Sequence, residues 1–207
     1  GDSSMSQLKL TADSGGGTVA IKGPASTTGN AAIELIVPGT ASGTLAVGDT
    51  GKILQVVQAV KTDTASSNTA TFADLSGLSV SITPASTSNK ILVSCNIHVS
   101  GRQDSFQAFK VFRDSTAIGL GTAGSNSQTN ASFGTQAINT GSAQYGLRTG
   151  NFEFLDTPSS TSALTYKIQW ASVYQSYTSY INRPYSVNDQ TFNIYASSSI
   201  TVYEVAA

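Results

Sequence analysis

The stretch Lys90-Ile-Leu-Val-Ser-Cys-Asn-Ile-His-Val99 places a hydrophobic residue at every second position. The residues of this alternating set are Ile91, Val93, Cys95, Ile97 and Val99. Alternation over this length predicts a β-strand with one buried face. The opposite face carries Leu92, Ser94, Asn96 and His98, a mixture that indicates contact with water. The stretch therefore predicts a half-buried strand.

The single cysteine and the single histidine of the chain both lie in this strand. Cys95 is on the hydrophobic face, so we expect a buried, inert thiol rather than a nucleophile, and no intrachain disulfide can form. His98 is on the other face, where a hydrogen-bonded structural role is favoured over catalysis. A catalytic triad needs an activated serine beside the histidine, and no Gly-x-Ser-x-Gly motif occurs.

Short hydrophobic segments separated by turn residues continue through residues 51–207, without a convincing helical pattern. Many short strands with frequent turns indicate a β-sandwich or barrel, and eight to ten strands fit a jelly-roll-like sandwich best. The fold class is therefore predicted as all-β. Strands are predicted at 52–60, 69–73, 78–82, 90–100, 106–113, 130–137, 147–156, 163–173, 177–182 and 199–205.

Two of these strands differ in their faces. In residues 164–170 one face is hydrophobic, with Trp170 expected in the core, and the other is polar. Residues 53–60 are hydrophobic on both faces. Such a strand lies under a second layer or at a subunit interface.

Residues 5–50 have a different pattern. Three short segments, at 8–10, 18–22 and 32–37, alternate like strands and are separated by turn-rich sequence. Three strands this short cannot enclose a core alone. We expect them to pair with neighbouring copies of the chain or to dock on residues 51–207. Residues 1–4, before Met5, are expected to be a cloning remnant.

Composition excludes several classes of partner. Charged residues make up 11% of the chain and the net charge is -1. With no basic stretch, we expect no nucleic-acid binding. No hydrophobic run approaches the roughly 20 residues needed to cross a bilayer, and the first residues are polar, so we expect neither membrane insertion nor a signal peptide.

Several phrases resemble tail-fibre and structural proteins of marine tailed phages, especially those that infect cyanobacteria. In the N-terminal part the resemblance lies in residues 7–35 and 48–55; in the rest it lies in 89–95, 112–119, 155–158, 163–169 and 199–207. The resemblance implies a homotrimer with a short β-repeat shaft and a jelly-roll-like head, located in the virion beside other tail or capsid proteins. It implies no catalytic residues.

Side chains for catalysis or for holding cofactors are sparse. Most acidic residues lie in predicted turns, where they bond their own backbone, with Glu153 and Glu204 in predicted strands. One histidine and one cysteine exclude the usual zinc sites, and no phosphate-binding glycine loop occurs. We therefore expect no enzyme activity, no metal and no cofactor, with a hydrolytic spike as the weakest alternative.

One aromatic cluster suggests a contact surface. It comprises Tyr174, Tyr177, Tyr180 and Tyr185, with Asn182 and Arg183 among them. Tyrosines beside amides suit a surface that binds a host glycan or protein. Packing of the same rings inside the fold or at a trimer interface is the alternative; the binding site would then lie in residues 121–130 or 139–146.

Two roles follow for the whole chain. The first is a tail-fibre or spike head that attaches to a host-surface glycan or protein. The alternative is a purely structural virion component, such as a capsid fibre or decoration protein.

Overall fold

The computed structural model describes residues 8–11, 18–21, 51–102, 105–122, 127–136, 144–174 and 177–207. The chain divides into two compact units, residues 1–45 and 46–207. In the first unit, β1 (Leu8–Thr11) pairs antiparallel with β2 (Thr18–Ile21). These strands confirm the predictions at 8–10 and 18–22, whereas the strand predicted at 32–37 lies outside the described residues.

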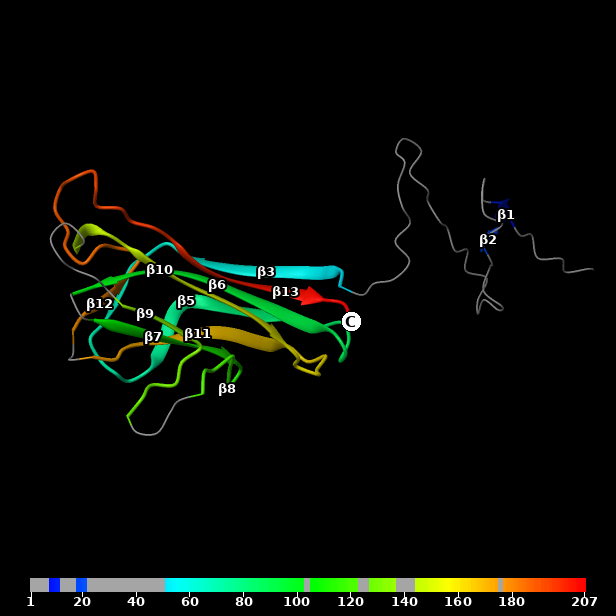
Figure 1. Ribbon diagram of the computed structural model, residues 1–207, viewed down its shortest axis with the longest axis horizontal. Coiled ribbons are helices and arrows are strands. Elements are labelled where there is room, and N and C mark those ends of the chain that lie inside the picture. The colour runs from blue at the N-terminus through cyan, green and yellow to red at the C-terminus, as the bar shows by residue number, and fades with distance from the viewer. Residues whose placement is uncertain are drawn as a thin grey trace, which may run out of the picture. The chain divides into compact units, whose positions relative to one another are not determined.

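The second unit is a sandwich of two antiparallel sheets (Figure 1). Neighbouring strands of the first sheet are, in order, β3 (Ile53–Lys61), β13 (Ser198–Val205), β6 (Lys90–Gly101) and β10 (Arg148–Asp156). Those of the second are β5 (Ala73–Ile82), β11 (Leu164–Ser172) and β7 (Phe106–Arg113), with β8 (Thr116–Ile118) and β9 (Phe133–Gln136) both paired to the far edge of β7.

The connectivity is that of a jelly roll. From β3 to β13 the chain changes sheet at most of its connections, so strands close in sequence face each other across the core. Two short strands, β4 (Ala65–Ser67) and β12 (Ser179–Ile181), extend the first sheet beyond the end of β13. The predicted all-β, jelly-roll-like sandwich is confirmed; the trimer and the shaft remain predictions.

The core lies between the sheets and is built from the alternating residues of the central strands. Ile91, Val93 and Ile97 on β6 are fully buried, and Cys95 is 2% exposed. The predicted burial of Cys95 is thus confirmed, and burial raises the pKa of its thiol to about 12. The predicted buried face of β11 is also confirmed, and Trp170 stacks on Phe109.

The strand prediction was wrong in two respects: the short strands β4 and β8 were not predicted, and β5 was divided in two. Residues 69–73 and 78–82 were expected as separate strands, but β5 runs from Ala73 to Ile82. Its register against β11 shifts, because Lys167 pairs with Ser79 whereas Gln169 pairs with Asp74. Gly77 lies in this irregular part with φ of 88°. A bulge of this kind breaks the alternation in the sequence without ending the strand.

The outward face of the second sheet carries paired polar side chains. On the second sheet, Lys167 and Gln169 donate to the Asp74 carboxylate at 2.9 and 2.8 Å. The Lys110 ammonium lies 4.3 Å from the centre of the Phe72 ring. This face is therefore polar and well paired, as expected for a surface in contact with water.

Candidate binding surfaces

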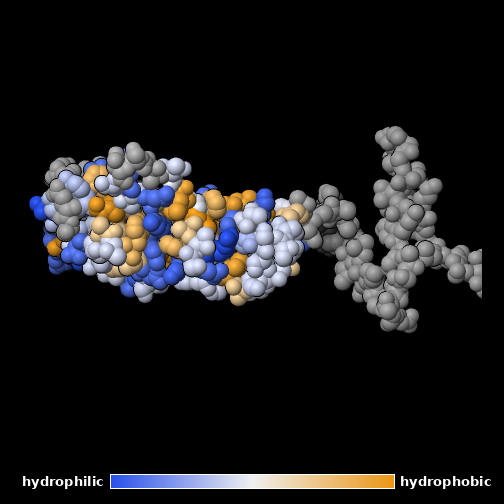
Figure 2. Space-filling model, turned by 90° about the horizontal axis from the view of Figure 1, so that it is seen from below, coloured by the Kyte–Doolittle hydropathy of each residue, from blue (hydrophilic) through white to orange (hydrophobic). Residues whose placement is uncertain are grey.

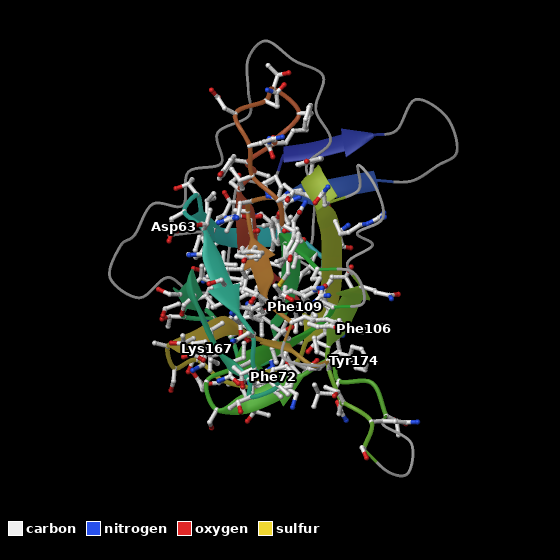
Figure 3. The ribbon with its side chains drawn as sticks, turned by 90° about the vertical axis from the view of Figure 1, so that its left-hand side faces the viewer. Asp63, Phe72, Phe106, Phe109, Lys167 and Tyr174 are labelled. Atoms are coloured by element: carbon white, nitrogen blue, oxygen red, sulfur yellow. The ribbon has the colours of Figure 1, made fainter. Side chains whose placement is uncertain are left out.

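The predicted tyrosines lie on the connection between β11 and β13, residues 173–197, and they form two groups. In the first, Tyr174 contacts Phe106 at 5.6 Å and Tyr177 at 6.3 Å between ring centres (Figure 3). The Arg102 guanidinium lies 4.6 Å from the Tyr177 ring. Of the four predicted tyrosines, Tyr174 alone is exposed, at 42%.

The second group contains Tyr180 and Tyr185, whose ring centres are 6.0 Å apart. The Arg183 guanidinium lies 4.3 Å from the Tyr180 ring and donates to the Pro184 carbonyl at 3.1 Å. Both rings are half-buried. The arginine is therefore used to hold the local chain conformation and to cover an aromatic ring.

Asn182, the remaining predicted contact residue, is fully buried. Its side-chain amide donates to the carbonyls of Lys61 and Asp63 at 2.8 and 2.9 Å, and its oxygen accepts from the Ser198 hydroxyl at 2.6 Å. Its φ of 63° is left-handed, a conformation that asparagine tolerates better than most residues. Asn182 therefore anchors the connection and does not form part of the surface.

A hydrophobic row crosses the outward face of the first sheet. The strand register aligns four residues on adjacent strands, in the order Val56, Tyr203, Leu92 and Leu155. Val56 and Leu155 are 54% and 46% exposed. Leu54 and Val60 extend the hydrophobic surface along β3. Two explanations were expected for a strand that is hydrophobic on both faces: a second layer of the same chain or a subunit interface. Among the described residues, no second layer covers the outward face of β3.

The row is defined by the strand register of the first sheet. On the side of the second unit that faces the viewer in Figure 2, hydrophobic residues are scattered among hydrophilic ones. Beyond the row, the first sheet becomes polar, with Gln58 donating to Thr201 at 2.8 Å and with Ser94 and Glu153 on the neighbouring strands. These polar residues therefore separate the row from Val60, which lies toward the other end of the same face.

A pocket of about 490 Å³ lies at the other end of the same face. Its floor is formed by His98 and Thr149, which are paired on β6 and β10 and lie 3.1 Å apart between Nδ1 and Oγ1. This contact agrees with the hydrogen-bonded role predicted for His98. The walls include Tyr145, Leu147, Phe192 and Ile194. Tyr145 and Phe192 meet edge to face, with ring centres 5.0 Å apart.

A second pocket, of about 550 Å³, lies beside β7 and β9. Its lining includes Phe106, Asn130 and Phe133. Two segments, 121–130 and 139–146, were the alternative binding sites if the tyrosines pack inside the fold. Residues of 121–130 line the pocket beside β7 and β9. Tyr145 and Gly146, from 139–146, line the pocket above His98.

The buried carboxylates are used by the fold. Both oxygens of Asp156 lie 2.7 Å from Arg113, and the Tyr166 hydroxyl donates to Asp156 at 2.7 Å. The pKa of Tyr166 is raised, mainly by burial and to a smaller extent by the Asp156 carboxylate. Within the described residues, no group of three or more histidine, cysteine, aspartate or glutamate side chains could hold a metal ion.

Glu204 is also buried and accepts three hydrogen bonds. Its donors are the Gln55 amide, the Asn89 amide at 2.6 Å and the Ala85 backbone N–H at 2.7 Å. Burial acts to raise the pKa of this carboxyl, but the three donors outweigh it and the pKa is lowered. Glu204 thus joins β13 to β3 and to the connection between β5 and β6.

No known family model matches the chain, and no curated protein matches it. Among solved structures, the VP2 subviral particle of infectious bursal disease virus is similar with a TM-score of 0.42 and 10% identity, over 83% of this chain and 37% of that one. The Gx strain of the same virus gives a TM-score of 0.36 and 12% identity, over 96% of this chain and 50% of that one. The chain spans half or less of the length of these proteins. In the described part of the chain, no helix is long and hydrophobic enough to cross a membrane.

Proposed function

We propose that this chain is a structural component of a virion surface, whose sandwich associates with further copies of itself, as a homotrimer, through the outward face of its first sheet. The observation that carries the proposal is the hydrophobic row Val56, Tyr203, Leu92 and Leu155, whose two end residues are exposed and whose two middle residues are half-buried. A contiguous exposed hydrophobic surface on a soluble domain marks an interaction site.

The charge of the row favours association between identical chains. Its four members are uncharged, so three copies of the row around a common axis meet without burying an unpaired charge from the row itself. The net charge of the whole chain is -1, so electrostatic repulsion between copies is weak. The part of the proposal that places the chain in a virion rests on the resemblance of its sequence to phage tail-fibre and structural proteins.

Host attachment, the other role expected from the sequence, has less support in the geometry. Asn182 is buried, and Arg183 covers a tyrosine ring of its own chain. Tyr174 is the most accessible of the predicted contact residues. Receptor binding through this surface stays a prediction.

Light scattering on the full chain tests the assembly, with three copies per particle as the expected result. The double variant Val56→Ser/Leu155→Ser should weaken association at least about tenfold, because two exposed hydrophobic anchors are lost. Leu120→Ser is a matched control, since Leu120 is 38% exposed and follows β8 of the other sheet. A monomeric wild-type chain at micromolar concentration, or equal effects of the control, would contradict the proposal. Mass spectrometry of purified virions tests whether the chain is one of their components.

A further inference from the structure

The pocket above His98 and Thr149 combines hydrophobic walls with a polar floor. The floor offers an imidazole and a hydroxyl, each able to donate or accept a hydrogen bond. The walls are the rings of Tyr145 and Phe192 and the aliphatic side chains of Leu147 and Ile194. A pocket with mostly hydrophobic walls and a few placed polar groups is typical of small-molecule sites.

The outer wall is part of a fixed loop. Ser186 N–H donates to the Gln144 carbonyl at 3.0 Å, and Ala196 N–H donates to the Asn182 carbonyl at 3.2 Å. Within the loop, the Asn193 amide donates to the Asn188 carbonyl at 2.8 Å. These bonds hold Phe192 and Ile194 opposite the sheet, although the two side chains are 49% and 63% exposed. A preformed wall lowers the entropy cost of binding.

The lining selects the chemistry of the occupant. No aspartate, glutamate, lysine or arginine side chain lines the pocket, which favours an uncharged ligand. Aromatic and aliphatic walls suit a ring with a C–H face, and the floor suits hydroxyl groups at the ring edge. A pyranose has both features, and about 490 Å³ is enough space for one sugar ring or two.

We propose that this pocket binds an uncharged saccharide, with one pyranose face against Tyr145 and Phe192 and its hydroxyls on His98 and Thr149. The inference is separate from the proposed assembly. The hydrophobic row crosses β6 at Leu92, six residues from His98, which is roughly 20 Å along an extended strand. One end of the face therefore remains open when the other is covered.

The only histidine of the chain gives a direct measurement of occupancy. Because His98 is unique, its imidazole gives a single assigned NMR signal in the full-length protein. The probes are methyl glycosides of glucose, galactose, mannose and N-acetylglucosamine. We expect at least one of them to shift this signal saturably, with a dissociation constant of roughly 1–10 mM.

Three variants and a control identify the site. Phe192→Ala and Tyr145→Ala should each weaken binding about tenfold by removing a wall, and Thr149→Val should do so by removing a hydroxyl of the floor. Tyr195→Ala is the matched control, because Tyr195 is 57% exposed on the same loop and does not line the pocket. Circular dichroism confirms that each variant is folded, and light scattering reports assembly independently.

The apolar probe p-cresol, which resembles a tyrosine side chain, separates a saccharide site from a protein-docking site. Loss of glycoside binding in Thr149→Val, with p-cresol binding absent or much weaker, supports the proposal. If no glycoside moves the His98 signal, the proposal is overturned. It is equally overturned if p-cresol binds more tightly than every glycoside and Thr149→Val leaves that binding unchanged.

Discussion

The Ser198 hydroxyl donates to the Asn182 side-chain oxygen at 2.6 Å and joins the two ends of the connection between β12 and β13. The same hydroxyl accepts the backbone N–H of His98 at 2.9 Å. One polar cluster therefore fixes both the floor and the outer wall of the candidate pocket. Its residues come from three separate parts of the chain.

The first prediction concerns Asn182. Asn182→Ala should destabilise the fold by about 2–4 kcal/mol, because it leaves buried carbonyls without donors and forces a left-handed φ on alanine. Asn182→Gly tolerates that φ and should recover about 1 kcal/mol of the loss. Urea unfolding of the two variants measures the difference. Equal stability of both variants and the wild type would show that the cluster contributes nothing.

The second prediction concerns acid stability through Glu204. Its pKa is lowered in the folded chain, so its contribution to stability is complete above the ordinary value of 4.5 and is lost as the pH falls through the lower folded value. Glu204→Gln should cost about 1.5–3 kcal/mol at neutral pH, with the deficit shrinking toward about pH 3.

Denaturant midpoints at the two pH values measure this effect. Glu153→Gln is the control, because Glu153 lies on the exposed side of β10 and its replacement should change stability by less than about 0.5 kcal/mol. A deficit for Glu204→Gln that is constant with pH would mean that the charge of the carboxylate is irrelevant.

The alternating patterns of β6 and β11 predicted their strands and their buried faces, because a strand packed on one side must alternate with period two. The outer wall of the pocket could not be predicted in the same way. Phe192 and Ile194 lie in an irregular segment, and hydrogen bonds to remote residues such as Gln144 set their position. The only signal in the sequence was the short alternation Phe192-Asn-Ile194 after the polar run 188–191, which is too short to predict a strand.

Asn182 is a residue whose position was predicted wrongly from the sequence. Composition placed it in a polar and aromatic contact surface, because asparagine beside tyrosine is typical of binding sites. Its burial follows from two carbonyls supplied by residues 61 and 63, more than a hundred positions earlier in the chain. Pairing across such a separation is a property of the sheet topology, which local sequence does not encode.

The third prediction compares two phenylalanines of β7. Phe109 is fully buried and stacks on Phe133 at 4.7 Å, so Phe109→Ala should cost about 3–5 kcal/mol. Phe106→Ala, at a position that is 38% exposed, should cost considerably less. Thermal unfolding of both variants checks the assignment of faces. A larger loss of stability for Phe106→Ala than for Phe109→Ala would show that the core lies on the opposite face of β7 from the one assigned.

The fourth prediction tests the tyrosines as a contact surface. Tyr174→Ala removes an exposed ring with edge contacts, and its stability cost should stay below about 1.5 kcal/mol. If this ring touches a host receptor, cell binding should weaken by about 1–2 kcal/mol with little change in melting temperature. Melting and cell binding are measured together on Tyr174, Tyr177, Tyr180 and Tyr185 variants. If all four variants lose stability, and cell binding falls only in proportion to unfolding, the rings serve the fold and not a contact surface.

The last prediction concerns the segment before the sandwich. Gly51 N–H donates to the Ala206 carbonyl at 2.7 Å, and Ala206 N–H donates to the Lys52 carbonyl at 2.9 Å, so the second unit retains its own closing contacts when residues 5–45 are removed. We expect the truncated chain to fold, with the melting temperature of its sandwich little changed. We also expect weaker association, because short strands that cannot enclose a core are predicted to pair with neighbouring copies. Light scattering and thermal unfolding on the same sample separate the two effects. A truncated chain that fails to fold would place the unit boundary earlier, and one that assembles as well as the full chain would leave the hydrophobic row of the first sheet as the sole interface.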